Sequence, residues 1–72
     1  MSSDPRIQFG DKIRRLRVAR NWSQEQLAEL SGLHRNYVGM VERGERNIAL
    51  LNIVKFARAF GLGPQALFDE MK

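Results

Sequence analysis

Apolar residues recur at helical spacing along the whole 72-residue chain, and glycines interrupt the pattern at short intervals. No stretch alternates apolar and polar residues in the way that a half-buried strand requires. The pattern predicts five short helices, over residues 7–20, 24–31, 35–43, 50–60 and from Pro64 onward. We therefore expect an all-α, compact five-helix fold in which residues 1–72 form a single domain.

Local signals mark where several of these helices begin and end. Ser23 followed by Gln26 is a capping-box pattern, in which each side chain satisfies a backbone amide of the first turn. Gly32 can adopt the positive φ of a tight helix exit, and Gly44 and Gly61 end the next two helices. Pro64 suits a first helical position because it needs no backbone N–H.

The side chains repeated at these spacings predict the core. In the first helix they are Phe9, Ile13 and Leu16, with Arg20 on the same side and Trp22 in the following turn. The later helices contribute Leu27 and Leu30, then Val38 and Val41, then Ile53, Phe56, Ala57 and Phe60, and finally Leu67 and Phe68. A core of this size stabilises one small domain and leaves little room for a deep pocket.

Composition narrows the classes of function. Twelve Lys and Arg against eight Asp and Glu give a net charge of +4, which suits a polyanionic partner, although a basic face kept for solubility is the alternative. The chain has no cysteine, which fits a reducing, cytoplasmic environment. No signal peptide is evident and no apolar run approaches the ~18 residues of a membrane span, so we expect no membrane association.

The chain lacks the groups that an enzyme needs. It has one histidine, no cysteine, no glycine-rich phosphate loop and no pair of carboxylates set apart from helix surfaces. His34 has no second ligand type beside it, so we interpret it as a neighbour of a helix N-cap or a phosphate contact rather than a metal ligand. We expect no catalytic residues, no cofactor, no metal and no small-molecule ligand.

Residues 24–43 meet the geometric demands of two short helices that cross steeply around a tight turn. Leu27 and Leu33 anchor the pair to the core, and Gly32 makes the turn. Ala28 is small where the helices approach, while Val38 and Val41 seat the second helix. This spacing predicts a helix-turn-helix and hence a DNA-binding surface.

The motif also resembles a known family. Two runs carry the resemblance, Ser23-Gln24-Glu25-Gln26-Leu27-Ala28-Glu29-Leu30-Ser31-Gly32-Leu33 and Tyr37-Val38-Gly39-Met40-Val41-Glu42-Arg43-Gly44. It continues through Arg46-Asn47-Ile48 and Pro64-Gln65-Ala66-Leu67-Phe68. Nearly the whole chain is thus similar to the Cro- and lambda-repressor-like helix-turn-helix family, whose five-helix DNA-binding domain it implies. Within that family, His34-Arg35-Asn36-Tyr37 is most similar to the controller proteins of restriction–modification systems, which are short dimeric regulators.

Two positions depart from the family pattern. Ala49 stands where the family usually places Ser or Thr to cap the fourth helix, a loss that costs about 1 kcal/mol. Ser31 stands where an apolar residue is usual, but its hydroxyl can satisfy a carbonyl at the helix end. Neither change removes a group that DNA binding requires.

The first turn of the second motif helix enters the major groove in this architecture, so His34, Arg35, Asn36, Tyr37 and, one turn later, Met40 can reach base edges. Arg35 can grip guanine O6 and N7, or contact a phosphate or solvent instead. Asn36 can read adenine, or support the cap. Tyr37 can contact a thymine methyl group or donate to a phosphate, or pack on the first helix.

Other polar residues are expected to contact the DNA backbone. The family resemblance implies that Gln24 holds a phosphate at the start of the first motif helix. Arg43, Arg46 and Asn47 follow the second motif helix and should clamp the same half-site, although a solvated loop is the alternative. The resemblance also implies an ion pair between Arg17 and Glu42 that has a structural role.

A domain this small covers about one half-site, which rarely supplies specific affinity, so we expect a homodimer on double-stranded DNA. The predicted interface is Leu62, Pro64, Gln65 and Phe68, although Phe68 can instead close the monomer core. Two-fold symmetry implies a pseudo-palindromic operator with half-sites about 10 base pairs apart.

These features predict a sequence-specific DNA-binding transcriptional regulator, with repression as the simpler mode. The alternative is a protein-interaction module such as an antitoxin or adaptor, against which Arg35 and Asn36 argue. Met1 and the charged Lys72 favour a complete chain, although a truncated larger repressor would have the same pattern.

Overall fold

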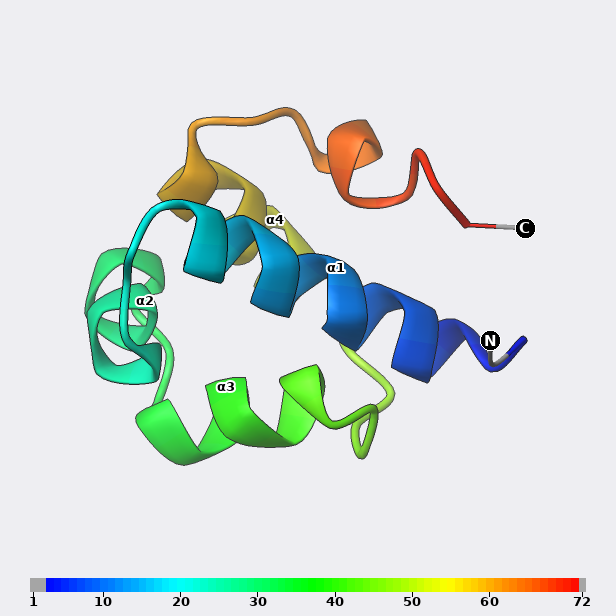
Figure 1. Ribbon diagram of the computed structural model, residues 1–72, viewed down its shortest axis with the longest axis horizontal. Helices are drawn as coiled ribbons and strands as arrows, with labels where there is room; N and C mark the ends of the chain where they lie inside the picture. Colours follow the sequence, from blue (N-terminus) through cyan, green and yellow to red (C-terminus); the bar gives the residue numbers. More distant parts are fainter. Residues whose placement is uncertain (1–2, 72) are drawn as a thin grey trace.

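The computed structural model describes residues 3–71 and arranges four α-helices and one short 3₁₀ helix around a common core (Figure 1). The α-helices are α1 (Pro5–Ala19), α2 (Gln24–Ser31), α3 (Arg35–Glu42) and α4 (Leu50–Phe60), and the 3₁₀ helix η1 spans Pro64–Leu67. Residues 3–71 contain no strand. The all-α fold expected from the spacing of apolar residues is therefore confirmed.

The expected count of five helices is wrong, because the last predicted helix is the single 3₁₀ turn η1. Pro64 begins this turn as predicted, but Phe68 ends it, and the amide of Met71 closes a further turn onto the Phe68 carbonyl at 3.1 Å. So short a segment gains few helical hydrogen bonds. The segment is held in place by the burial of Leu67, which is 1% exposed.

The helix ends follow the local signals closely. Ser23 Oγ accepts from the Gln26 amide at 3.0 Å, and Gln26 Oε1 accepts from the Ser23 amide at 2.7 Å, so the capping box is present. Gly32 adopts φ +73° at the end of α2. Helix α1 begins two residues earlier than predicted, because Asp4 accepts from the Arg6 amide and Pro5 occupies the first position. Ala49 starts α4 without a side-chain cap, as expected.

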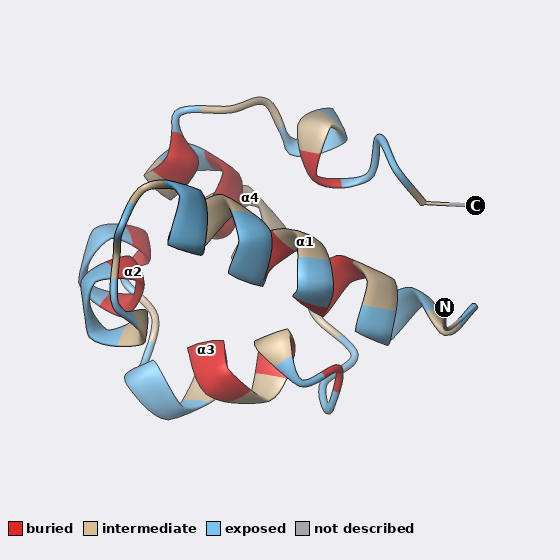
Figure 2. Ribbon diagram, viewed as in Figure 1, coloured by how far each residue is buried: buried red, intermediate tan, exposed pale blue. Residues whose placement is uncertain are grey.

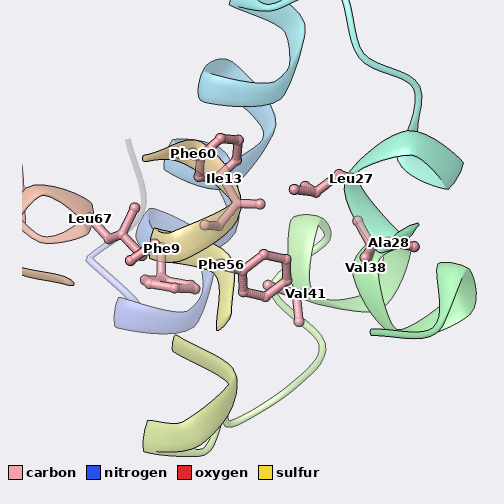
Figure 3. Packing of buried hydrophobic residues seen from close by; sticks show 10 residues of the cluster. Phe9, Ile13, Leu27, Ala28, Val38, Val41, Phe56, Phe60 and Leu67 are labelled. Atoms are coloured by element: carbon pink, nitrogen blue, oxygen red, sulfur yellow. The ribbon is translucent and has the colours of Figure 1, made fainter. Parts of the chain in front are cut away.

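The core gathers side chains from all four α-helices and η1 (Figure 3). Its buried hydrophobic residues are Phe9, Ile13, Leu27, Ala28, Val38, Val41, Phe56, Ala57, Phe60 and Leu67. The prediction that Leu30 points inward is wrong, since Leu30 is 55% exposed. The buried face of α2 consists of Leu27, Ala28 and Ser31, which turns Leu30 outward. Ser31 Oγ donates to the Ala28 carbonyl at 3.2 Å, as its place before the turn suggested.

Arg20 joins the end of α1 to the end of α4. Its guanidinium lies 4.9 Å from the Phe60 ring centroid and 5.7 Å from that of Trp22, and the two rings stack 5.7 Å apart. Arg20 Nη2 also donates to the Phe60 carbonyl at 3.1 Å. Stacking of this kind leaves the charge satisfied while its stem covers apolar surface. The helical position of Arg20 among apolar residues thus reflects a structural role.

The C-terminal segment packs against α1. The rings of Phe68 and Phe9 are 5.4 Å apart, and Lys12 Nζ donates to Asp69 at 2.9 Å and to Glu70 at 2.6 Å. Arg15 reaches the same Glu70 carboxylate at 3.1 Å. The hydrogen bond from Lys12, with that from Arg15, lowers the pKa of Glu70. These contacts place the C-terminal segment on a side of α1 away from the α2–α3 pair (Figure 1).

Candidate nucleic-acid interface

Helices α2 and α3 form a helix-turn-helix joined by residues 32–34. The amide of Leu33 donates to the Ala28 carbonyl at 3.0 Å, which closes the turn directly after Gly32. Val38, Gly39 and Val41 are the buried residues of α3, whereas residues 34–36 are exposed (Figure 2). The helix therefore seats its second half in the core and presents its first turn to solvent, as a helix that enters the major groove must.

The Glu42 carboxylate holds the pair to the rest of the domain. Arg17 Nε and Nη2 donate to its two oxygens at 2.7 and 3.0 Å, and Gln24 Nε2 donates to Oε1 at 3.1 Å. The side chains of Arg17 and Glu42 are 13% and 3% exposed. The hydrogen bonds that Arg17 donates to Glu42 raise the pKa of Arg17. The Glu42 carboxylate at the end of α3 thus contacts Arg17 of α1 and Gln24, the first residue of α2.

Three exposed polar residues lie at the start of α3. His34 is itself the N-cap, and its Nδ1 accepts from the Asn36 amide at 3.2 Å. Arg35 Nη1 donates to Glu25 Oε1 of α2 at 2.7 Å, and both side chains are more than half exposed. Asn36 is exposed beside them. The arginine can leave this carboxylate for a guanine at little cost, since exposed ion pairs are weak.

Tyr37 is half-buried and connects α3 with the start of α4 and with the loop between them. Its hydroxyl oxygen accepts from Asn52 Nδ2 at 3.0 Å, and the Arg46 guanidinium lies 5.4 Å from its ring centroid. Sequence reasoning missed Asn52, because nothing in the spacing of residues 37 and 52 indicates that they meet. Tyr37 keeps one face of its ring beside a cation, which favours a role at a charged surface.

Arg43 and Asn47 lie in the exposed segment after α3, and Met40 is half-buried on α3 itself. Arg43 Nε donates to Glu45 Oε2 at 2.9 Å. This hydrogen bond lowers the pKa of Glu45 and raises the pKa of Arg43, so both groups stay charged at neutral pH. Glu45 accepts from Nε and Nη2 of Arg43, which leaves the N–H groups of Nη1 to donate to a DNA phosphate.

The four residues predicted to form a dimer interface lie together after α4. Pro64 and Gln65 are exposed on η1, Phe68 is 38% exposed, and Leu62 is half-buried against the core. Phe68 also contacts Phe9, so part of its ring closes the monomer. The apolar surface left over is available to a second molecule.

Within residues 3–71, no group of three or more His, Cys, Asp or Glu side chains has the proximity that a metal ion requires. In the same residues, no helix is both long enough and apolar enough to cross a membrane.

An exposed, polar first turn on the second helix of a helix-turn-helix defines a DNA-binding protein of the helix-turn-helix class. The model of the HTH_3 helix-turn-helix family matches residues 13–67, which include α2, α3 and α4, and the chain belongs to this family. The resemblance seen in the motif residues is thus confirmed.

Related proteins share most of the chain. Control protein C.BamHI of Bacillus amyloliquefaciens is 44% identical over 70 residues, which cover 96% of this chain and 86% of the relative. Control protein C.SmaI of Serratia marcescens is 53% identical over 51 residues, or 71% of this chain and 61% of the relative. The solved structure of the restriction-modification controller protein C.AhdI from Aeromonas hydrophila matches with a TM-score of 0.85 at 54% identity, covering 88% of this chain and 96% of that one.

Proposed function

We propose that this chain is a dimeric controller protein that regulates transcription in a restriction–modification system by binding a pseudo-palindromic operator. The observation that carries the proposal is the exposed first turn of α3, where Arg35 and Asn36 stand beside the His34 cap. Similarity to control proteins along nearly the whole chain supports the same class of regulator. The assignment gives no residue a catalytic role.

The side chains around α3 divide into two kinds of DNA contact. Arg35 and Asn36 are exposed in the first turn of α3 and are assigned to base edges, with Met40 one turn later. Gln24, Arg43, Arg46 and Asn47 flank the helix and are assigned to phosphates, as is His34. Phosphate contacts set the orientation of the domain, and the base contacts choose the sequence.

Dimerisation follows from the size of the interface. One such domain contacts about one half-site, and specific affinities of about 10⁻⁸–10⁻¹¹ M need more contact than that. The surface of Leu62, Pro64, Gln65 and Phe68 is the assigned interface. Two copies related by a two-fold axis would place their α3 helices in successive major grooves, about 10 base pairs apart.

Selection from a random duplex library tests the proposal. The protein is incubated with the library at about 0.15 M salt, near physiological ionic strength, and the bound duplexes are sequenced. We expect a two-fold-symmetric motif with half-sites about one helical turn apart. Weak binding that depends only on salt and selects no sequence would overturn the regulator and favour an antitoxin-like or adaptor role.

Arg35→Ala tests the assignment of the base contact. It should lower affinity for the selected duplex by about 1–3 kcal/mol and remove the preference for guanine at one position of each half-site. Arg14→Ala removes the same charge from an exposed position on α1 and is the matched control. If both variants lose affinity equally on all sequences, Arg35 acts only through its positive charge and does not read a base.

A further inference from the structure

The side chain of Asn52, in the first turn of α4, makes its hydrogen bond to another helix. Asn52 is the third residue of α4, where a polar side chain often reaches back to the residue that caps the helix. Ala49 has no side-chain cap hydrogen bond, and the Asn52 backbone amide donates to the Ala49 carbonyl at 3.0 Å. The Asn52 carboxamide instead reaches α3 and donates to Tyr37.

The chemistry of this hydrogen bond gives the Tyr37 hydroxyl a direction. The amide nitrogen of Asn52 can only donate, so the Tyr37 oxygen accepts, 3.0 Å away. The hydroxyl proton of Tyr37 must then point away from Asn52. A hydroxyl that already accepts one hydrogen bond is also a better donor, because hydrogen bonds in a chain polarise one another.

A cation stands beside the same ring. The Arg46 guanidinium lies 5.4 Å from the centre of the Tyr37 ring, and Arg46 is exposed in the segment between α3 and α4. Tyr37 itself is half-buried, so its ring packs against the core and also lies beside the Arg46 guanidinium. The hydroxyl donor and the positive charge therefore lie together beside α3.

We propose that Asn52 is a positioning residue for DNA binding, which holds the Tyr37 hydroxyl so that its proton is donated to a phosphodiester oxygen, with Arg46 beside the same phosphate. The inference rests on the proposed function, since it requires duplex DNA at α3. It adds to that function a residue that makes no DNA contact of its own. It also resolves the role of Tyr37 in favour of a phosphate rather than a thymine methyl group.

A double-mutant cycle tests the coupling. The affinities of the wild type, Asn52→Ala, Tyr37→Phe and the double variant are measured on the symmetric duplex recovered by the library selection. Tyr37→Phe should weaken binding about ten-fold or more, the usual cost of losing a hydrogen bond to a charged group. Asn52→Ala should weaken binding in the wild type and have no further effect in the Tyr37→Phe background.

Asn52→Asp separates positioning from packing. The aspartate has the same shape but accepts only, so it takes the Tyr37 proton that the phosphate needs. We expect Asn52→Asp to keep the thermal midpoint near that of the wild type and to weaken DNA binding at least as much as Asn52→Ala. A purely structural Asn52 would show the reverse, with Asn52→Ala lowering the midpoint and leaving the DNA affinity of the folded protein unchanged.

A duplex with one uncharged methylphosphonate linkage, moved along each strand in turn, identifies the contacted group. One linkage in each half-site should weaken binding by the wild type more than binding by Tyr37→Phe, because the variant loses only the Arg46 contact at that phosphate. If no linkage shows this dependence, the phosphate assignment is wrong. If the wild type selects no duplex at all, the proposed function fails first, whereas selection without coupling between residues 37 and 52 overturns only this inference.

Discussion

Glu42 shows how much of the domain can depend on a single carboxylate. Its oxygens accept from Arg17 on α1 and from Gln24 at the start of α2, while its own backbone ends α3. Removing one partner of a buried ion pair leaves an unpaired charge, at a cost of about 3–5 kcal/mol. Arg17→Met should therefore lower the free energy of unfolding by about that amount in urea titrations.

Two further variants keep this prediction decisive. Glu42→Gln retains the shape of the side chain and still accepts hydrogen bonds, so it should cost less than Arg17→Met and should fold. Arg15→Met removes an arginine whose partners, Asp11 and Glu70, are more than half exposed, and it should cost about 1 kcal/mol or less. If Arg17→Met and Arg15→Met lower the free energy of unfolding equally, the Arg17–Glu42 pair stabilises the domain no more than an exposed ion pair does.

At the scale of elements, the crossing of α1 and α3 depends on Gly10. A Cβ atom at Gly10 would collide with the Val41 carbonyl oxygen and lie 2.9 Å from that of Glu42. Backbone atoms at the end of α3 cannot move without displacing Glu42, so the crossing distance would have to increase. Gly10→Ala should lower the free energy of unfolding by about 1–3 kcal/mol, the usual cost of overpacking.

Gly39 provides the matched control. It also lies inside a helix, but a Cβ atom there would meet side-chain atoms and not backbone atoms. Its nearest atom would be Arg43 Nη1, at 3.2 Å, the end of a long exposed side chain. Gly39→Ala should stabilise the domain by about 0.5–1 kcal/mol through helix propensity. Denaturation of the two variants side by side checks the contrast, and a similar stability change in both would contradict the role given to Gly10.

At the scale of the whole molecule, the proposed two-fold dimer leads to a prediction about charge. A symmetric interface brings a residue near its own copy, so a new charge there faces itself. Gln65→Glu should convert the proposed dimer to a monomer in sedimentation equilibrium. The helical circular dichroism should be unchanged, because Gln65 is exposed in the monomer.

Leu51→Glu tests whether the exposed leucines at the start of α4 form the dimer interface instead. Leu50 and Leu51 are 75% and 64% exposed at the start of α4, whereas Phe68 of the assigned interface is 38% exposed. We expect Leu51→Glu to remain dimeric. If Leu51→Glu dissociates the protein while Gln65→Glu does not, the dimer forms through the first turn of α4 and the assigned interface is wrong.

Much of the fold and the exposed position of the candidate DNA-binding residues could be predicted from the sequence. The capping box of Ser23 and Gln26 and the positive φ of Gly32 depend on atoms within a few residues of one another, so local chemistry sets them. The exposed first turn of α3 followed from the spacing of Val38 and Val41, which assigns that helix an inner face. The Arg17–Glu42 contact came from family resemblance, because no spacing rule joins residues so far apart.

Tertiary structure alone decided the rest. Leu30 has helical spacing like its neighbours, but the helices that pack on α2 meet Leu27, Ala28 and Ser31 instead. The hydrogen bond from Asn52 to Tyr37 and the close approach at Gly10 depend on how helices cross. Apolar periodicity determines which face of a helix is buried, and only the packed domain determines which residue of another helix that face meets.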